Sequence, residues 1–217
     1  YVLEMITKVN SNNAVINPTT DTQAGEYYRH YSDLLYVDAL TQVYNRRFYE
    51  ELMKNSTKTA GVAMLDIDDF KLYNDVYGHD VGDSAIRTVA RVAKECLKSS
   101  DYIIRYGGDE FVLVLPDISA AEFASTLKQI CNKVHESIIG GYQHLTLSVS
   151  IGGVLLKDET VAEALQRADK LMYHAKLRKN IVITESTPHE SGILNNDKKN
   201  NVLIVDDSEM NRFLLKE

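Results

Sequence analysis

YIIRYGGDEFVLVL, at residues 102–115, is the most informative segment of this chain for its fold. Residues 102–105 and 111–115 form two largely apolar runs, and Tyr-Gly-Gly-Asp-Glu lies between them. Two apolar runs around a Gly-Gly turn are typical of a β-hairpin. The pattern therefore predicts a pair of antiparallel strands that carries Asp109 and Glu110 at its tip.

Outward from this hairpin, strand-like and helix-like patterns alternate. Short apolar runs predict strands at residues 61–65, 145–151 and 181–183. Apolar residues at helical spacing predict helices at residues 39–54, 70–77, 83–98, 120–138 and 161–177. The order strand, helix, helix, hairpin, helix, strand, helix, strand implies one layered α/β domain with a mixed sheet, spanning residues 38–184.

Polar segments flank this domain on both sides. Residues 1–37 combine helix-like stretches with a linker rich in Asn, Thr and Asp, and residues 185–200 form a second polar linker. The helix-like stretch just before the domain either pairs with its copy in a dimer or packs on its own domain, and the sequence favours neither. Residues 201–217 begin a new strand–helix pattern that stops in mid-helix, so we expect a fragment of a longer protein.

The composition is ordinary for a globular protein, with 44% hydrophobic and 25% charged residues. The net charge of −7 argues against broad binding to nucleic acid. Cys96 and Cys131 lack metal-type spacing and fit a reducing cytosol better than a disulfide framework. No apolar run approaches the roughly 20 residues of a membrane span, and there is no signal peptide. We therefore expect a cytoplasmic fragment without a nucleic-acid or membrane partner.

Three acidic residues converge if the predicted sheet is correct. Asp66 follows the first predicted strand, and Asp109 and Glu110 lie at the hairpin tip. Clustered carboxylates repel one another unless a cation neutralises them, and Mg²⁺ together with phosphate oxygens commonly does so. Gly107 and Gly108 remove side chains where a ligand would approach the backbone. The tip therefore predicts a site for a metal ion and a phosphorylated ligand.

Each of these features also has a plainer explanation. A Gly-Gly-Asp turn is most often only a hairpin turn, and acidic residues after a strand usually cap a helix or face solvent. Lys71, Lys176 and Lys179 are placed to meet phosphate charge, but a lysine at a helix end usually answers the helix dipole. The combination in one chain is much more specific than any single part.

The chain resembles the GGDEF family, the diguanylate cyclases, in its motifs and their spacing. RYGGDEF at residues 105–111 reproduces the signature that names this family. Further blocks are similar to family motifs: DALT at 38–41 with NRR at 45–47, DIDDFK at 66–71, ND at 74–75 with GHDVGD at 78–83, SVSIG at 148–152, and AD at 168–169 with Tyr173 and AK at 175–176. The resemblance implies a nucleotidyl-cyclase, palm-like α/β (α+β) fold, with a mixed, mostly antiparallel central sheet flanked by helices.

The resemblance also implies roles for the acidic residues. Asp66 and Asp109, with the backbone carbonyl of Ile67, would bind Mg²⁺, for which Mn²⁺ is an alternative. Asp109 would also help to deprotonate the attacking 3′-hydroxyl, and Glu110 would be a second required acid at the same tip. These positions are the expected catalytic and metal-binding centre.

Substrate contacts are implied in the same way. Asn74 and Asp83 would read guanine, because a carboxylate accepts from both N1–H and N2–H₂ of guanine, and adenine offers no such donor pair. The other expected substrate contacts are Lys71, Lys176, the turn glycines Gly107 and Gly108, and the backbone amides near Asp69 and Phe70. Lys179 joins this set, although its helix end is one residue shorter than the family pattern and lacks the glycine. Gln42 stands at a local turn where the family usually has glycine.

The implied enzyme is a diguanylate cyclase that condenses two GTP molecules into cyclic di-GMP with release of two pyrophosphates, in bacterial second-messenger signalling. Each of two domains would hold one GTP, so we expect a homodimer. One alternative is a catalytically silent GGDEF domain that binds GTP or cyclic di-GMP, but such relatives usually lose signature acids that this chain keeps. Another is a cyclase that makes a different cyclic nucleotide, against which Asp83 argues.

Two further stretches resemble known motifs. NVLIVDDS at residues 201–208 is similar to the start of a response-regulator receiver domain, truncated at Glu217. It implies two-component signalling with a histidine kinase as a candidate partner. Many GGDEF domains bind cyclic di-GMP at an Arg-x-x-Asp site before the signature strand, where this chain has Lys98 and Asp101. Because lysine lacks the guanidinium fork, we expect little product inhibition through this site.

Overall fold

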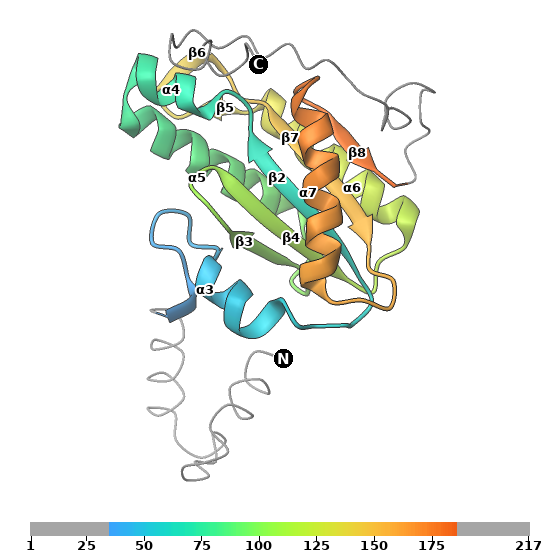
Figure 1. Ribbon diagram of the computed structural model, residues 1–217. Helices are drawn as coiled ribbons and strands as arrows, with labels where there is room; N and C mark the ends of the chain where they lie inside the picture. Colours follow the sequence, from blue (N-terminus) through green and yellow to red (C-terminus); the bar gives the residue numbers. More distant parts are fainter. Residues whose placement is uncertain (1–34, 186–217) are drawn as a thin grey trace, which may run out of the picture. The chain divides into compact units, whose positions relative to one another are not determined.

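The computed structural model describes residues 35–185 (Figure 1). The predicted segments at residues 1–34 and the receiver-like stretch at residues 201–217 lie outside the described residues, as does the second linker beyond Glu185. Within the described range, no helix is both long enough and apolar enough to cross a membrane. The described residues therefore correspond to the predicted central domain.

A six-stranded sheet forms the centre of this domain, in the order β1-β3-β4-β2-β7-β8 (Figure 1). Its strands are β1 Tyr44–Asn45, β2 Ala60–Ile67, β3 Tyr102–Arg105, β4 Glu110–Pro116, β7 Val149–Leu155 and β8 Val182–Thr184. The four inner strands pair antiparallel, whereas β1 and β8 are parallel to their neighbours at the two edges. A separate two-stranded sheet pairs β5 Ile138–Ile139 with β6 Tyr142–Thr146. The expected mixed, mostly antiparallel sheet and its β3–β4 hairpin are confirmed.

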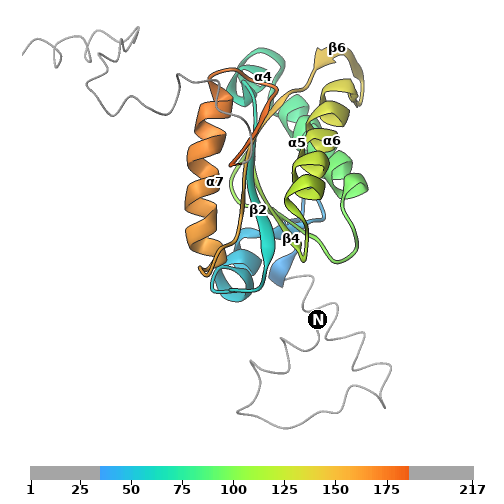
Figure 2. The same cartoon turned by 90° about the vertical axis from the view of Figure 1, so that its right-hand side faces the viewer.

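Helices cover both faces of the sheet. The longer ones are α4 Phe70–Tyr77, α5 His79–Cys96, α6 Ala120–Glu136 and α7 Val161–Lys176, and the short ones are α3 Arg46–Phe48 and the π-helix η1 Tyr49–Met53. Figure 2 shows α7 on one face and α5 and α6 on the other. Side chains alternate along β2, so Ala63 and Leu65 join the core with α5 and α6, while Val62 and Met64 join the core with α7. By the same alternation, Asp66 emerges on the α7 face.

Several elements agree closely with the sequence pattern. α4 and β3 have the predicted bounds, and α6, α7 and β4 differ by only a residue or two at an end. α5 begins at His79 instead of Asp83, because Gly78, with φ +87°, ends α4 and leads directly into α5. The end of α4 is therefore packed against the start of α5.

The predicted helix at residues 39–54 is wrong in its first part. The chain first makes a turn, in which the Asp38 carboxylate accepts hydrogen bonds from the N–H and the hydroxyl of Thr41. Gln42 adopts a left-handed backbone, with φ +57°, and such a residue does not continue a right-handed helix. This conformation also explains why glycine is usual at the position. Helical structure begins only at Arg46, after β1.

The predicted strand at residues 145–151 is two strands. β6 ends at Thr146, and β7 starts at Val149 and continues through Gly152. A glycine weakens a strand pattern, but Gly152 has a packing reason. A Cβ at this position would overlap the Ala168 carbonyl oxygen, so the missing side chain lets α7 lie directly against the sheet. This close packing sets the position of the C-terminal end of α7 beside Asp66.

Candidate active site

The sheet register brings the predicted acidic residues onto neighbouring strands. In the β2–β4 pair, Asp66 lies directly opposite Glu110. The Asp109 backbone carbonyl accepts a hydrogen bond from the Ile67 N–H at 3.3 Å, which ties the hairpin tip to the end of β2. Directly opposed residues of an antiparallel pair have their side chains on the same face. The predicted convergence is therefore present for the Asp66 and Glu110 side chains, and the backbone of Asp109 lies beside them.

Asp66 is the buried member of this cluster. Its side chain is 3% exposed, and its Oδ2 accepts from the Lys176 ammonium at 2.6 Å. Its Oδ1 is also buried, and it has no hydrogen-bond partner in the described part of the chain. Burial raises the pKa of Asp66 to about 6, Lys176 opposes this shift, and the negative charges of Asp109 and Glu110 add to it. One oxygen of this buried carboxylate thus has no hydrogen-bond partner in residues 35–185, and the charges of two further acids act on it.

Lys176 is the last residue of α7 and lies 110 residues after Asp66 in the sequence. Burial lowers its pKa, but the ion pair with Asp66, together with the charges of Asp109 and Glu110, outweighs that effect and leaves the pKa raised. Its side chain is 42% exposed, so the ammonium reaches a buried acid from the surface. The predicted phosphate-binding lysine is thus placed in the acidic centre.

The corner after α7 also holds the loop that follows β2. Ser150 donates to Oδ1 of the buried Asp68 at 2.6 Å, and the Asn180 N–H donates to Oδ2 at 2.9 Å. The Lys179 ammonium donates to both carboxylate oxygens of Asp69, at 2.8 and 2.7 Å. Lys179, predicted to contact phosphate, therefore contacts an acid of the loop in this structure.

The expected substrate residues on α4 and α5 lie at the junction of these helices. Asn74 is close to Gly82, since a Cβ at Gly82 would overlap its Oδ1. Asp83 follows Gly82 and is about half exposed, with its Oδ2 3.9 Å from the Arg87 guanidinium. The structure therefore brings together the two residues expected to read guanine.

The remaining predicted positions lie on α4 and just before it. Lys71 is exposed in the first turn of α4, while Phe70 packs partly against the core. Asp69, with φ +54°, precedes the helix, and its side chain makes no capping hydrogen bond. Asp69 therefore occupies the N-cap position of α4 without capping it through its side chain, and its exposed carboxylate binds Lys179 instead.

Neither turn glycine is required by its backbone conformation, because neither has a positive φ. A Cβ at Gly107 would lie 2.5 Å from Glu110 Oε2, so the Glu110 carboxylate folds over the turn. A Cβ at Gly108 would meet no atom within 4 Å. Only Gly108 thus leaves open space for a ligand, whereas Gly107 makes room for a site acid.

Sequence reasoning assigned no role to Arg105, which the structure shows holding the turn. Its Nη2 donates to the Gly108 carbonyl at 2.8 Å and its Nε donates to the same oxygen at 3.2 Å. Its Nη1 donates to the Asp38 carboxylate at 3.2 Å. Burial raises the pKa of Asp38, but hydrogen bonds from Thr41 and the charge of Arg105 outweigh this and lower it. A guanidinium two residues before a Gly-Gly turn was the available signal.

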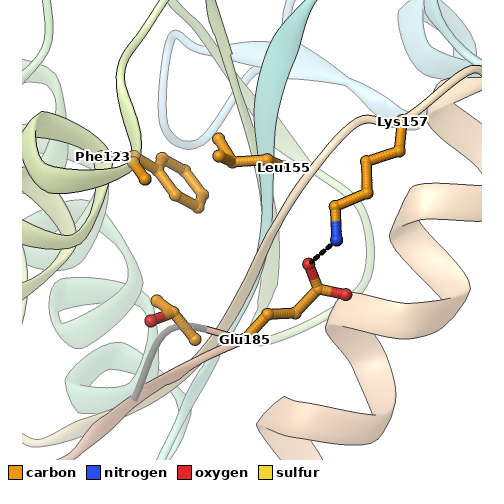
Figure 3. Close-up of a pocket in the computed structure, with 6 residues that line it drawn as sticks. Phe123, Leu155, Lys157 and Glu185 are labelled. Carbon is orange, nitrogen blue, oxygen red and sulfur yellow. Dashed lines mark hydrogen bonds and ion pairs between the residues drawn. The ribbon is translucent and has the colours of Figure 1, made fainter. Parts of the chain in front are cut away.

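A separate pocket lies away from this acidic cluster, between α6, β7 and β8 (Figure 3). Its volume is about 220 Å³, and Phe123 and Leu155 line its apolar side. The Lys157 ammonium pairs with Glu185 at 3.2 Å across another side (Figure 3). Lys157 and Glu185, the charged residues that line this pocket, already neutralise each other. We therefore assign the candidate active site to the acidic cluster and not to this pocket.

The acidic cluster has only part of the ligand set of a metal site. In residues 35–185, no three His, Cys, Asp or Glu side chains are gathered closely enough to hold an ion by themselves. The buried, partnerless Oδ1 of Asp66 nevertheless fits a metal ligand, since oxygen ligands suit hard divalent cations. Backbone carbonyls and a substrate's phosphates would complete such a coordination shell.

A family model described as diguanylate cyclase, GGDEF domain, matches residues 35–180. The chain belongs to the GGDEF family. It is 37% identical to the diguanylate cyclase DosC of Escherichia coli K12 over 152 residues. This aligned region covers 65% of this chain and 33% of DosC. It is 30% identical over 171 residues to diguanylate cyclase A of Treponema denticola, covering 77% of this chain and 44% of that protein. The chain thus spans less than half the length of these curated relatives.

Solved GGDEF structures have the same fold. The GGDEF domain of DgcB from Caulobacter crescentus, in complex with c-di-GMP, superimposes with a TM-score of 0.63 and 30% identity, covering 68% of this chain and 94% of that one. In the present chain, the signature RYGGDEF runs from the last residue of β3 through the β3–β4 turn to the start of β4. GGDEF diguanylate cyclases generally use a divalent metal ion, which agrees with the chemistry of the Asp66 carboxylate.

Proposed function

We propose that this GGDEF domain catalyses the condensation of two GTP molecules into cyclic di-GMP. The observation that carries the proposal is the opposed pair of Asp66 and Glu110, with Asp109 on the adjacent turn and one buried oxygen of Asp66 unpartnered. All signature acids are retained. A centre this rich in carboxylates is suited to holding a cation and the charge of a triphosphate.

In this proposal Asp66, Asp109 and the Ile67 carbonyl hold Mg²⁺, with Mn²⁺ as an alternative. Such an ion, when bound, would neutralise charge on the phosphates. Asp109 accepts the proton of the attacking 3′-hydroxyl, and Glu110 is the second acid, held over the turn in the space that Gly107 leaves open. The open side of Gly108 admits the nucleotide to the backbone.

Asn74 and Asp83 are proposed to read guanine at the junction of α4 and α5. Asp83 accepts from N1–H and N2–H₂, whereas adenine presents no such donor pair, so ATP would leave this carboxylate unsatisfied. Gly82 has a part in this recognition, because it gives the Asn74 side chain its place. Lys71, Lys176 and Lys179 would meet the phosphates, together with the backbone N–H groups near Asp69 and Phe70.

Two such domains, each holding one GTP, are proposed to face each other in a homodimer. Each 3′-hydroxyl oxygen forms a bond to the α-phosphorus of the other GTP as the bond to the pyrophosphate oxygen breaks. Two phosphodiester bonds form, two pyrophosphates leave, and two hydroxyl protons are lost. Positioning of the two nucleotides and charge neutralisation supply most of the rate.

The test is product analysis by chromatography and mass spectrometry, using the full-length protein with GTP and Mg²⁺. The expected products are cyclic di-GMP and two equivalents of pyrophosphate, and none above background with Asp109→Asn. Tight binding of GTP without turnover would point to a silent signalling domain instead. A cyclic product containing adenine, from mixed ATP and GTP, would point to a cyclase of different specificity.

We also propose a cellular setting, which rests on sequence alone. The domain would span residues 38–184 and would work in the cytoplasm, in two-component signalling. The receiver-like segment at residues 201–217 would link it to a histidine kinase. Phosphotransfer from candidate kinases to the full-length protein would test this link, and its absence with every kinase of the source organism would contradict it.

A further inference from the structure

The Asp66–Lys176 ion pair joins a buried acid to a partly exposed base. Asp66 is 3% exposed, whereas Lys176 is 42% exposed, and their charged atoms are 2.6 Å apart. A buried carboxylate cannot lose its counter-cation without a large desolvation cost. A lysine at the surface, on its flexible four-carbon stem, can move its ammonium into water or toward another anion. Asp66 therefore needs the charge of Lys176, whereas Lys176 does not need Asp66.

A metal ion and the Lys176 ammonium would compete for the same carboxylate. Lys176 binds Oδ2, and the buried Oδ1 is the oxygen that still lacks a partner. A divalent cation on Oδ1 would sit within a few ångströms of the ammonium, where like charges repel strongly. Binding of the ion thus favours departure of Lys176.

The displaced side chain would move on a fixed backbone. Asn180 donates to Asp68 and Lys179 donates to Asp69, so the corner after α7 stays attached to the loop after β2. Only the Lys176 side chain then has to swing, and it remains at the edge of the acidic centre, where the triphosphate would lie.

We propose that Lys176 is an internal counter-cation that neutralises Asp66 until a divalent metal ion displaces it, and that the displaced ammonium then binds the phosphates of the incoming nucleotide. The second half of this proposal rests on the proposed function, but the first half does not. Metal binding and nucleotide binding are then coupled, because the ion releases a cation that the nucleotide uses.

The first experiment measures Mn²⁺ binding without nucleotide, by the electron paramagnetic resonance signal of free Mn²⁺. Lys176→Met should bind Mn²⁺ about tenfold more tightly than wild type, since a competing charge-assisted bond is gone. Lys179→Met is the matched control. It removes a lysine from the same corner, but one whose partner Asp69 is exposed, so it should change Mn²⁺ affinity much less. Unchanged or weaker Mn²⁺ binding by Lys176→Met would overturn the proposal.

Loss of Lys176 leaves a buried acid unpaired, so Lys176→Met is expected to melt at a lower temperature. Mn²⁺ should therefore raise its melting temperature by more than it raises that of wild type. Lys176→Arg keeps the charge, and its Mn²⁺ affinity should stay near that of wild type. Equal metal-induced shifts in Lys176→Met and wild type would also count against the proposal.

The second experiment measures coupling, as the ratio of affinities for a non-hydrolysable GTP analogue with and without Mn²⁺. This ratio should be smaller in Lys176→Met than in wild type. A protein that makes no cyclic di-GMP but shows tighter Mn²⁺ binding in Lys176→Met would refute the proposed function and keep the counter-cation role. A protein that makes cyclic di-GMP but shows no tighter Mn²⁺ binding in Lys176→Met would keep the proposed function and refute the counter-cation role.

Discussion

Arg105 and Asp38 are 67 residues apart in sequence, and the guanidinium of one donates to the carboxylate of the other at 3.2 Å. The same guanidinium donates to the Gly108 carbonyl at 2.8 Å. One side chain thus joins the first turn of the domain to the turn that carries Asp109. The side chains of the pair are 18% and 21% exposed, so water screens the contact only in part.

Arg105→Met should lower the rate of cyclic di-GMP formation by about tenfold to a hundredfold, because a small displacement of a catalytic group is costly. Asp38→Asn removes only one attachment of the guanidinium and should cost less. Arg91→Met, which breaks an exposed pair with Glu95 on α5, is the control and should leave the rate unchanged. Wild-type rates in Arg105→Met would show that the turn keeps its position without this clamp.

The same contact predicts a pH dependence of stability. Interactions with Thr41 and Arg105 hold the pKa of folded Asp38 below its unfolded value, so the unfolded chain binds its proton first as the pH falls. The stabilisation is complete above the unfolded pKa, near 3.8, and is lost as the pH falls through the lower folded value. Urea unfolding at pH 7 and at pH 3 should show a smaller acid-induced loss in Asp38→Asn than in wild type. Equal losses would contradict the shift.

Asp109→Asn should retain the fold, since the residue lies at a turn, and should lower the rate by at least about 10²–10³. In a mixture with wild-type chains, mixed dimers would form one phosphodiester bond but close the ring poorly. We therefore expect the linear dinucleotide to accumulate in such mixtures, measured by mass spectrometry. Wild-type specific activity should also rise with protein concentration. A flat specific activity in demonstrably monomeric protein would contradict the two-domain mechanism.

Gly82→Ala should weaken GTP binding with little loss of stability. The added Cβ would displace the end of the Asn74 side chain, which can rotate away cheaply, and alanine favours a helix. The KM for GTP should rise toward that of Asn74→Ala. Gly152→Ala is the contrasting variant, because its Cβ would meet the backbone of α7, and thermal melting should show it strongly destabilised. An unchanged KM in Gly82→Ala would sink the guanine role of Asn74.

Product inhibition at Lys98 and Asp101 should be weak. The Lys98 ammonium pairs with Glu122 at 2.6 Å, and Asp101 accepts from the Lys98 N–H at 2.8 Å, so both groups already have partners. A lysine also lacks the planar fork that binds two acceptors of guanine at once. Calorimetry should detect little cyclic di-GMP binding at this place. Tight binding that Lys98→Ala abolishes would prove the expectation wrong.

Local patterns in the sequence were sufficient for most of the regular structure. The hairpin around Gly107 and Gly108, the helix α4 and the strand β3 depend on nearby residues, and their predicted bounds agree with the structure. The motifs also named the acids of the site, because the resemblance lies in residue types at fixed spacing. What a short stretch of chain decides by its own propensities can be predicted from that stretch.

Contacts between distant segments were decided by the tertiary structure alone. Residues 39–54 read as one helix, but Arg105 and the left-handed Gln42 hold their first part in a turn. The pairing of Lys176 with Asp66 spans 110 residues, as does that of Lys179 with Asp69. These pairs exist because the register of β2 and β4 and the close packing of α7 on Gly152 set the final positions of their backbones. Spacing along the chain carries no information on such distances until the sheet has formed.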